Sequence, residues 1–104
     1  MEISKLKQKS DRSYTIALEK QNALEKAKSR MLFAHNGHLF NADAETISLV
    51  KTLSEDLGTF VILDVNDNPV LIEDPKALLD ALKSKNQEVL NSYHQLYKTI
   101  TETR

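Results

Sequence analysis

Cysteine is absent from this 104-residue chain, and glycine and proline each occur only twice. Without cysteine the chain has no disulfide, no thiolate metal site and no thiol nucleophile. So few glycines and prolines exclude collagen-like and linker-like chains, and they disfavour a β-sandwich or barrel, whose many turns need both. No apolar run is long enough to cross a membrane, and the first residues lack the apolar stretch of a secretory signal. We expect one cytoplasmic domain, residues 1–104, with no membrane association.

The net charge of −1 is unevenly distributed along the chain. Residues 1–31 have eight basic and four acidic residues (net +4), residues 32–74 have one and eight (net −7), and residues 75–104 have five and three (net +2). A basic N-terminal segment beside an acidic middle indicates either contact with a polyanion or complementary patches that meet within or between subunits. The candidate phosphate contacts are Lys5, Lys7, Lys9, Arg12, Lys26, Lys28 and Arg30.

Turn and cap signals divide the chain into short elements. Asn36-Gly37 lies between two apolar runs and predicts a hairpin with a type I′ turn. Asn41 or Asp43 is the predicted N-cap of the helix that follows. Asp74 before a proline predicts the start of the last helix. The predicted helices are 3–31, 44–57 and 75–101, and the predicted strands are 32–35, 38–41, 59–63 and 70–72.

These elements predict the order α-β-β-α-β-β-α and the α+β class. A lone hairpin is marginal in water, so we expect the two hairpins to form one small antiparallel sheet packed by the long N- and C-terminal helices. The alternative is that the hairpins pair across a subunit boundary. The first helix would be marginal in isolation, so it must dock on another surface or fray, and we expect residues 1–10 to be the least ordered.

The last helix has apolar residues spaced alternately three and four apart, which is a heptad pattern over three repeats. Asn86 occupies an a-type position, where a buried Asn fixes the register and oligomer state of a coiled coil; the alternative is an Asn that faces solvent. A chain of this size has little interior for three apolar helical stripes, so we expect the last helix to form a homo-oligomer interface. The predicted interface residues, called the heptad stripe here, are Leu79, Leu82, Asn86, Val89, Tyr93, Leu96 and Ile100.

Two sets of polar residues in predicted turns have side chains of the kind that bind metal ions. The run from Asp64 to Asn68 resembles the opening of a calcium loop, but prolines occupy the glycine and glutamate positions that complete such a loop. A hairpin turn therefore explains this run. His35 and His38 flank the Asn-Gly turn and could supply two zinc ligands, but the sequence places no third. Polar side chains at a hairpin tip are the preferred interpretation, and metal binding by the pair stays open.

Catalytic patterns are missing from the sequence. It has no Gly-rich phosphate loop, nucleophile elbow or His-Glu-x-x-His pattern. Asp64 directly follows the most apolar segment, so burial predicts a raised pKa for its carboxyl. A single such acid does not make a site, and we predict no catalytic residue, no metal site and no cofactor.

One stretch of the chain resembles a known group of proteins. Phe60-Val61-Ile62-Leu63-Asp64, the turn after it, and Leu90-Asn91-x-Tyr93-x-x-Leu96-Tyr97 are similar to small uncharacterised proteins of tailed phages infecting marine bacteria, over residues 60–97. The resemblance implies a viral accessory protein in the host cytoplasm and assigns no functional residue.

The sequence therefore predicts a non-enzymatic, homo-oligomeric assembly or interaction protein, such as a phage accessory protein or a scaffold or chaperone component. Its partner is itself, or another protein. The alternative is a nucleic-acid-binding protein that uses the basic N-terminal helix.

Overall fold

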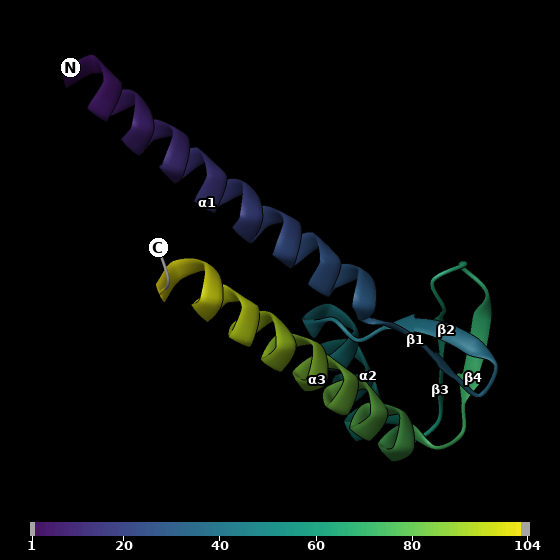
Figure 1. The fold of residues 1–104 in the computed structure, drawn as a ribbon. Helices are drawn as coiled ribbons and strands as arrows, with labels where there is room; N and C mark the ends of the chain where they lie inside the picture. The colour runs from purple at the N-terminus through teal and green to yellow at the C-terminus, as the bar shows by residue number, and fades with distance from the viewer. Residues whose placement is uncertain (1, 103–104) are drawn as a thin grey trace.

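Three helices and two β-hairpins alternate along the chain in the computed structural model (Figure 1). The elements are α1 (Glu2–Arg30), β1 (Leu32–His35), β2 (His38–Asn41), α2 (Ala44–Leu57), β3 (Phe60–Leu63), β4 (Pro69–Ile72) and α3 (Pro75–Glu102). The structure describes the backbone of residues 2–102 and the side chains of residues 12–102. The predicted order and the α+β class are confirmed. The fraying expected for residues 1–10 falls on side chains outside the described residues and stays a prediction.

The local signals position the turns and caps as predicted. Asn36 and Gly37 have φ angles of 51° and 81°, as a type I′ turn requires. Of the two candidate N-caps of α2, Asp43 is the one used, because its carboxylate accepts a hydrogen bond of 2.8 Å from the Thr46 amide. Asp74 caps α3 in the same way, accepting from the Ala77 amide at 3.2 Å.

The two hairpins remain two separate two-stranded antiparallel sheets, β1–β2 and β3–β4, whereas the sequence predicted one sheet. Their backbones meet at one hydrogen bond of 3.0 Å, donated by the Val65 amide just after β3 to the Leu39 carbonyl of β2. The hairpins pack through their side chains instead of extending a common ladder. The chain signals that set each turn are local, and they carry no information on how two hairpins meet.

A closed apolar core lies where the hairpins, α2 and the first half of α3 come together. Its fully buried side chains include Phe40, Val50, Leu78 and Leu82, each no more than 2 % exposed. Phe60 and Ile62 from β3 and Val70 and Ile72 from β4 complete it. We call residues 31–85, which contain this core, the body.

The remainder of the molecule is an extended pair of helices. α1 and the second half of α3 run side by side in opposite directions and project away from the body (Figure 1). We call residues 12–30 and 86–102 the arm. The molecule measures 67 × 24 × 23 Å, and its radius of gyration of 19.4 Å exceeds the value of about 13 Å expected for a compact chain of this length.

Candidate functional site

The heptad stripe is divided between the interior and the surface of the single chain. Leu82 is fully buried in the body, and Val89 and Ile100, at 1 % and 6 % exposed, are buried on α3. Leu79 and Tyr93 are partly buried, and Leu96 remains 43 % exposed. Since α3 packs against α2 and α1, most of the stripe is an internal contact. Leu82, Val89 and Ile100 are therefore core residues of one chain and are not available as a surface for a second copy.

Asn86 of the heptad stripe has a partner within its own chain. Its side-chain Nδ2 donates a hydrogen bond of 2.8 Å to the carbonyl oxygen of Ala42, 44 residues away. Ala42 is fully buried, and its amide donates to the carbonyl of Met31 at 2.9 Å. Asn86 thus ties α3 to the β2–α2 connection at the junction of arm and body. Neither of the two roles expected from the sequence describes it.

An apolar groove runs along one side of the arm where it meets the body. The groove has a volume of about 510 Å³. Its lining includes Leu24, Met31 and Leu90, together with Asn86, Asn41 and Ala44. Leu24 and Leu90 are each 36 % exposed. We call this cavity the arm groove. Leu90 directly follows Val89 of the heptad stripe in the sequence, whereas Leu24 lies on α1.

Aromatic residues follow the arm groove along α3. The rings of Tyr93 and Tyr97 lie 6.2 Å apart between centroids, as expected for residues four apart on a helix. The Nζ of Lys20 on α1 lies 5.3 Å from the centroid of the Tyr97 ring, a cation–π contact across the two helices. Tyr97 is still 39 % exposed. The arm surface therefore combines apolar and aromatic side chains that its own two helices cover only in part.

The described basic residues of α1 do not form one patch. Lys26 and Arg30 line a small pocket with Tyr93 and Leu96, whereas Lys28 lines the arm groove. Arg12 is also exposed, further along α1. The remaining candidates, Lys5, Lys7 and Lys9, lie outside the residues whose side chains are described. The phosphate-contact candidates that the structure does describe are thus spread over different sides of the arm.

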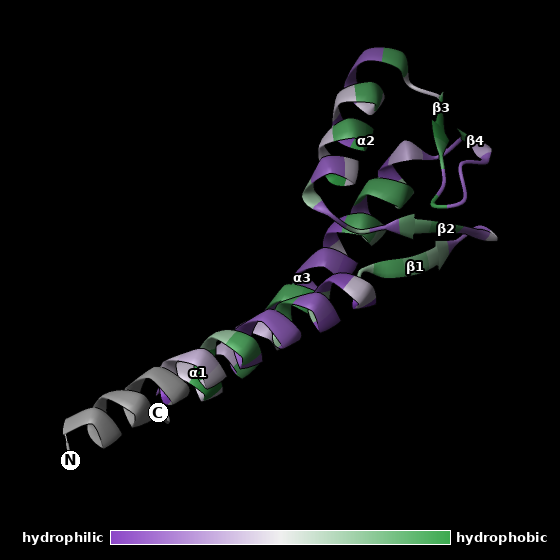
Figure 2. Cartoon of the chain, turned by 90° about the horizontal axis from the view of Figure 1, so that it is seen from above, coloured by the Kyte–Doolittle hydropathy of each residue, from purple (hydrophilic) through white to green (hydrophobic). Residues whose placement is uncertain are grey.

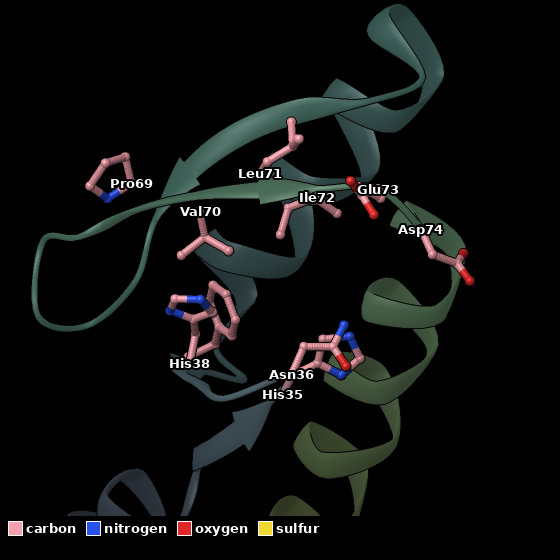
Figure 3. A pocket seen from close by; sticks show the side chains of 10 residues that line it. His35, Asn36, His38, Pro69, Val70, Leu71, Ile72, Glu73 and Asp74 are labelled. Carbon is pink, nitrogen blue, oxygen red and sulfur yellow. The ribbon is translucent and has the colours of Figure 1, made fainter.

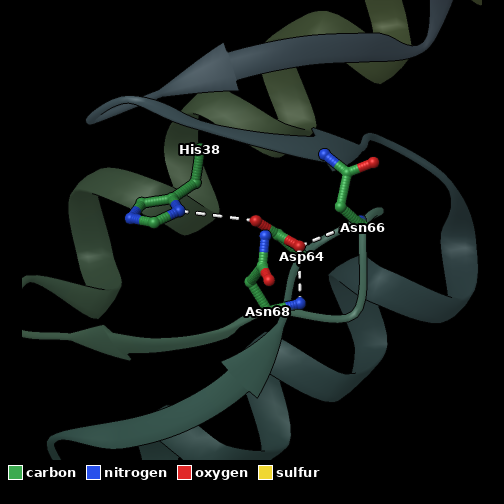
Figure 4. Close-up of polar contacts among 4 residues, drawn as sticks. All are labelled: His38, Asp64, Asn66 and Asn68. Carbon is green, nitrogen blue, oxygen red and sulfur yellow. Dashed lines mark hydrogen bonds and ion pairs between the residues drawn. The ribbon is translucent and has the colours of Figure 1, made fainter.

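Asp64 organises the turn between β3 and β4 (Figure 4). Its Oδ1 accepts hydrogen bonds of 2.9 Å from the amides of both Asn66 and Asn68. Its Oδ2 lies 3.4 Å from Nδ1 of His38 on the other hairpin. The backbone closes the same turn, with the Asp64 amide donating to the Asn68 carbonyl at 2.9 Å. The Asp64 carboxylate thus accepts hydrogen bonds from two amides of the turn, as Asp side chains commonly do in turns. The Asp-Asn-rich run is therefore a hairpin turn, as predicted.

The pKa of Asp64 is lowered, and the sequence prediction of a raised pKa is wrong. The amide of Asn68 is the largest cause, because it donates to the charged form; burial opposes it, and the amide of Asn66 and the His38 ring add to the lowering. The side chain is indeed only 3 % exposed. The prediction counted burial but not the amides that the turn aims at the carboxylate.

His35 and His38 face each other across β1 and β2 at the mouth of a cleft between the two hairpins (Figure 3). The cleft has a volume of about 380 Å³, with Val70 and Ile72 on one wall and Glu73 at its rim. Within residues 12–102, no three His, Asp or Glu side chains come close enough together to hold a metal ion. His38 contacts Asp64 instead, which links the first hairpin to the second.

The outer side of the β3–β4 hairpin is apolar. Val61 of β3 pairs with Leu71 of β4, and Leu63 pairs with Pro69. Val61, Leu63 and Leu71 are 57 %, 60 % and 57 % exposed. Figure 3 shows Leu71 pointing to the opposite side of β4 from Val70, and Figure 2 shows β3 hydrophobic along its length. We call Val61, Leu63, Pro69 and Leu71 the outer face; the unbroken apolar run of the strand was its signal in the sequence.

No helix among residues 2–102 has the length and apolar character that crossing a membrane requires. Comparisons with protein-family models, with curated proteins and with solved structures find no match. The surfaces of the molecule are therefore the basis on which its function is inferred.

Proposed function

We propose that this chain is a non-enzymatic assembly protein in which the arms of two copies pair through the arm groove. The observation that supports the proposal is the arm itself, a layer of two helices with Leu24 and Leu90 in its groove left partly exposed. A single layer of amphipathic helices buries its apolar residues only when a second layer covers them. A second two-helix arm supplies that layer and completes a four-helix bundle.

The exposed area of the chain is large enough for such a contact. Its accessible surface of 7541 Å² exceeds by about 1,600 Å² the area of about 5,900 Å² expected for a compact monomer of 11.8 kDa. A stable interface of ordinary size takes about 800 Å² from each partner. The net charge of −1 adds little overall repulsion between copies. Area and charge therefore both favour a second copy as the partner of the arm.

The resemblance of residues 60–97 to tailed-phage proteins extends this proposal to a biological setting. An arm-paired homo-oligomer with no catalytic pattern suits an accessory, scaffold or chaperone component that acts in the cytoplasm of an infected cell. The arm would hold the copies together, and the bodies would remain at the two ends of the assembly.

Sedimentation velocity tests the proposal. We expect the chain to sediment as a dimer or larger species at tens of micromolar, and the double variant Leu24→Glu/Leu90→Glu to sediment as a monomer, because charges placed in the arm groove oppose its burial. Leu18→Glu is the matched control: Leu18 is on the same helix and 43 % exposed, but it does not line the groove. A monomeric parent chain, or a dimer unaffected by the double variant, would contradict the proposal.

A nucleic-acid-binding function is the competing explanation for the basic residues of α1. Phosphate contacts made by several Lys and Arg weaken steeply as salt rises. Labelled DNA and RNA titrated at low and high salt therefore separate the two functions. We expect no salt-sensitive binding, because Lys26 and Arg30 lie away from Lys28. Tight binding that salt abolishes would favour the competing function.

A further inference from the structure

The outer face of the β3–β4 hairpin is unusual for a surface that meets only water. An antiparallel sheet with one solvated face alternates apolar and polar residues, whereas a strand covered on both sides is apolar throughout. β3 and β4 follow the second pattern: Phe60 and Ile62 point into the core, and Val61 and Leu63 point out. The β1–β2 hairpin is different, since Asn41 and Ala34 share its exposed side with leucines. The outer face is therefore built to be covered.

The charges around the outer face indicate what covers it. The chain has no basic residue between Lys51 and Lys76. Within that stretch every charged residue is acidic, namely Glu55, Asp56, Asp64, Asp67, Glu73 and Asp74. All of them except Asp64 are exposed. Two outer faces packed against each other would bring together two acidic segments of the chain, which disfavours that arrangement. The complementary surface is apolar and basic.

The chain itself contains a segment of that chemistry. Residues 2–12 combine two apolar residues and four basic residues with only two acidic ones; in order they are Glu2, Ile3, Lys5, Leu6, Lys7, Lys9, Asp11 and Arg12. This segment cannot reach the outer face of its own copy. α1 runs away from the hairpins toward its N-terminus, along a molecule 67 Å long (Figure 1). A second copy placed antiparallel along the arm brings its N-terminal end toward the body of the first.

We propose that the N-terminal segment 2–12 of one copy docks on the outer face of a second copy. The inference rests on the proposed pairing of arms and specifies its direction as antiparallel. A two-fold axis makes the contact reciprocal, so that both outer faces and both N-terminal segments are used and the assembly closes as a dimer. The four basic residues of the N-terminal segment then meet the acidic residues between Lys51 and Lys76 of the other copy.

Disulfide trapping tests this contact, because the natural chain has no cysteine that could interfere. A Ser4→Cys chain is mixed with a Thr59→Cys chain and oxidised with glutathione disulfide; Thr59 is exposed and directly precedes β3. The matched control mixes Ser4→Cys with Ser48→Cys, since Ser48 is exposed on α2. We expect the 4–59 heterodimer to form at least about tenfold faster than the 4–48 heterodimer, owing to the higher local concentration of the docked segment. Added salt should reduce this advantage.

The outcomes separate this contact from the pairing of arms. If the 4–59 and 4–48 heterodimers form at equal rates in a chain that sediments as a dimer, the docking is wrong and the pairing of arms still stands. Faster formation of the 59–59 homodimer would overturn the docking in favour of outer faces packed together. A chain that sediments as a monomer and shows no preferred heterodimer would overturn both. If 4–59 forms fastest, and Leu71→Lys slows it while sedimentation still shows a dimer, the docking is supported.

Discussion

The arm and the body bury similar apolar side chains to different extents. In the body, Phe40, Val50 and Leu82 are surrounded by hairpins, α2 and α3, and at most 2 % of each is exposed. In the arm, Leu24 and Leu90 remain 36 % exposed although the two helices contact each other. A single layer of two helices has only one contact between helices, whereas the body has several elements packed around one centre. The body thus completes its own core, and the arm needs a second molecule to complete one.

The size of the buried side chains also distinguishes the arm from the body. The α1 positions buried in the arm are Ala23 and Ala27, each 6 % exposed. Small side chains let two helices approach closely but contribute little apolar area. The larger leucines of α1, Leu18 and Leu24, lie outside this contact and remain exposed. The arm is therefore held together by a narrow contact and carries its larger apolar side chains on the outside.

The largest expected effect is on the body. Phe40→Ala should lower the free energy of unfolding by about 3–5 kcal/mol, because it empties the centre of the closed core. Urea denaturation followed by circular dichroism measures the loss. Leu39→Ala, in the same strand but 37 % exposed, is the control and should change stability by about 0.5 kcal/mol. Equal losses at the two positions would mean that the body has no closed core.

A smaller effect is expected inside the arm, at two positions of the heptad stripe. Val89→Ala should cost about 2 kcal/mol of unfolding free energy, since Val89 is 1 % exposed. Leu96→Ala should cost less than about 1 kcal/mol at its 43 % exposed site. Urea denaturation of both variants measures the difference. A greater loss of stability at Leu96 would show that the stripe is not divided as described.

The junction of the two regions depends on one side-chain hydrogen bond. Asn86→Ala removes the donor to the buried Ala42 carbonyl and should cost about 1–2 kcal/mol. Asn91→Ala, at an exposed position of the same helix, controls for the change in helix propensity. Urea denaturation of both variants measures the difference. If the two variants are equally stable, the bond does not couple arm and body.

The sequence predicted the elements well because their boundaries depend on neighbouring residues. The Asn36-Gly37 turn, the Asp43 cap and the Asp74 cap each act within four residues of chain, and all three are confirmed. Contacts between distant segments were less predictable. The partner of Asn86 lies 44 residues away, and no local pattern connects it to Ala42. Two hairpins were likewise predicted without any signal for whether they would share a ladder.

The candidate surfaces were predictable only in part, for a related reason. The heptad spacing correctly identified an apolar side of α3, but spacing does not say whether α1 or a second copy covers it. Leu82 and Leu96 are equivalent in the pattern, yet one is fully buried and the other 43 % exposed. The outer face had a clearer signal, because the run from Phe60 to Leu63 is apolar at every position. Such a run indicates that both faces of the strand are covered, but it does not identify the surface that covers the outer one.

The smallest expected effect is a pH dependence that belongs to the body alone. The pKa of Asp64 lies below its ordinary value of 3.8 when the chain is folded. Its contribution to stability is therefore complete above that value and is lost as the pH falls through the folded pKa, because the unfolded chain takes up the proton first. Asp64→Asn should flatten the decline in stability as the pH falls below about 4. Asp67→Asn, in the same turn but exposed, should leave the decline unchanged. Denaturation across this pH range measures both variants, and an unchanged decline in Asp64→Asn would mean that the amides of Asn66 and Asn68 do not hold the charged carboxylate.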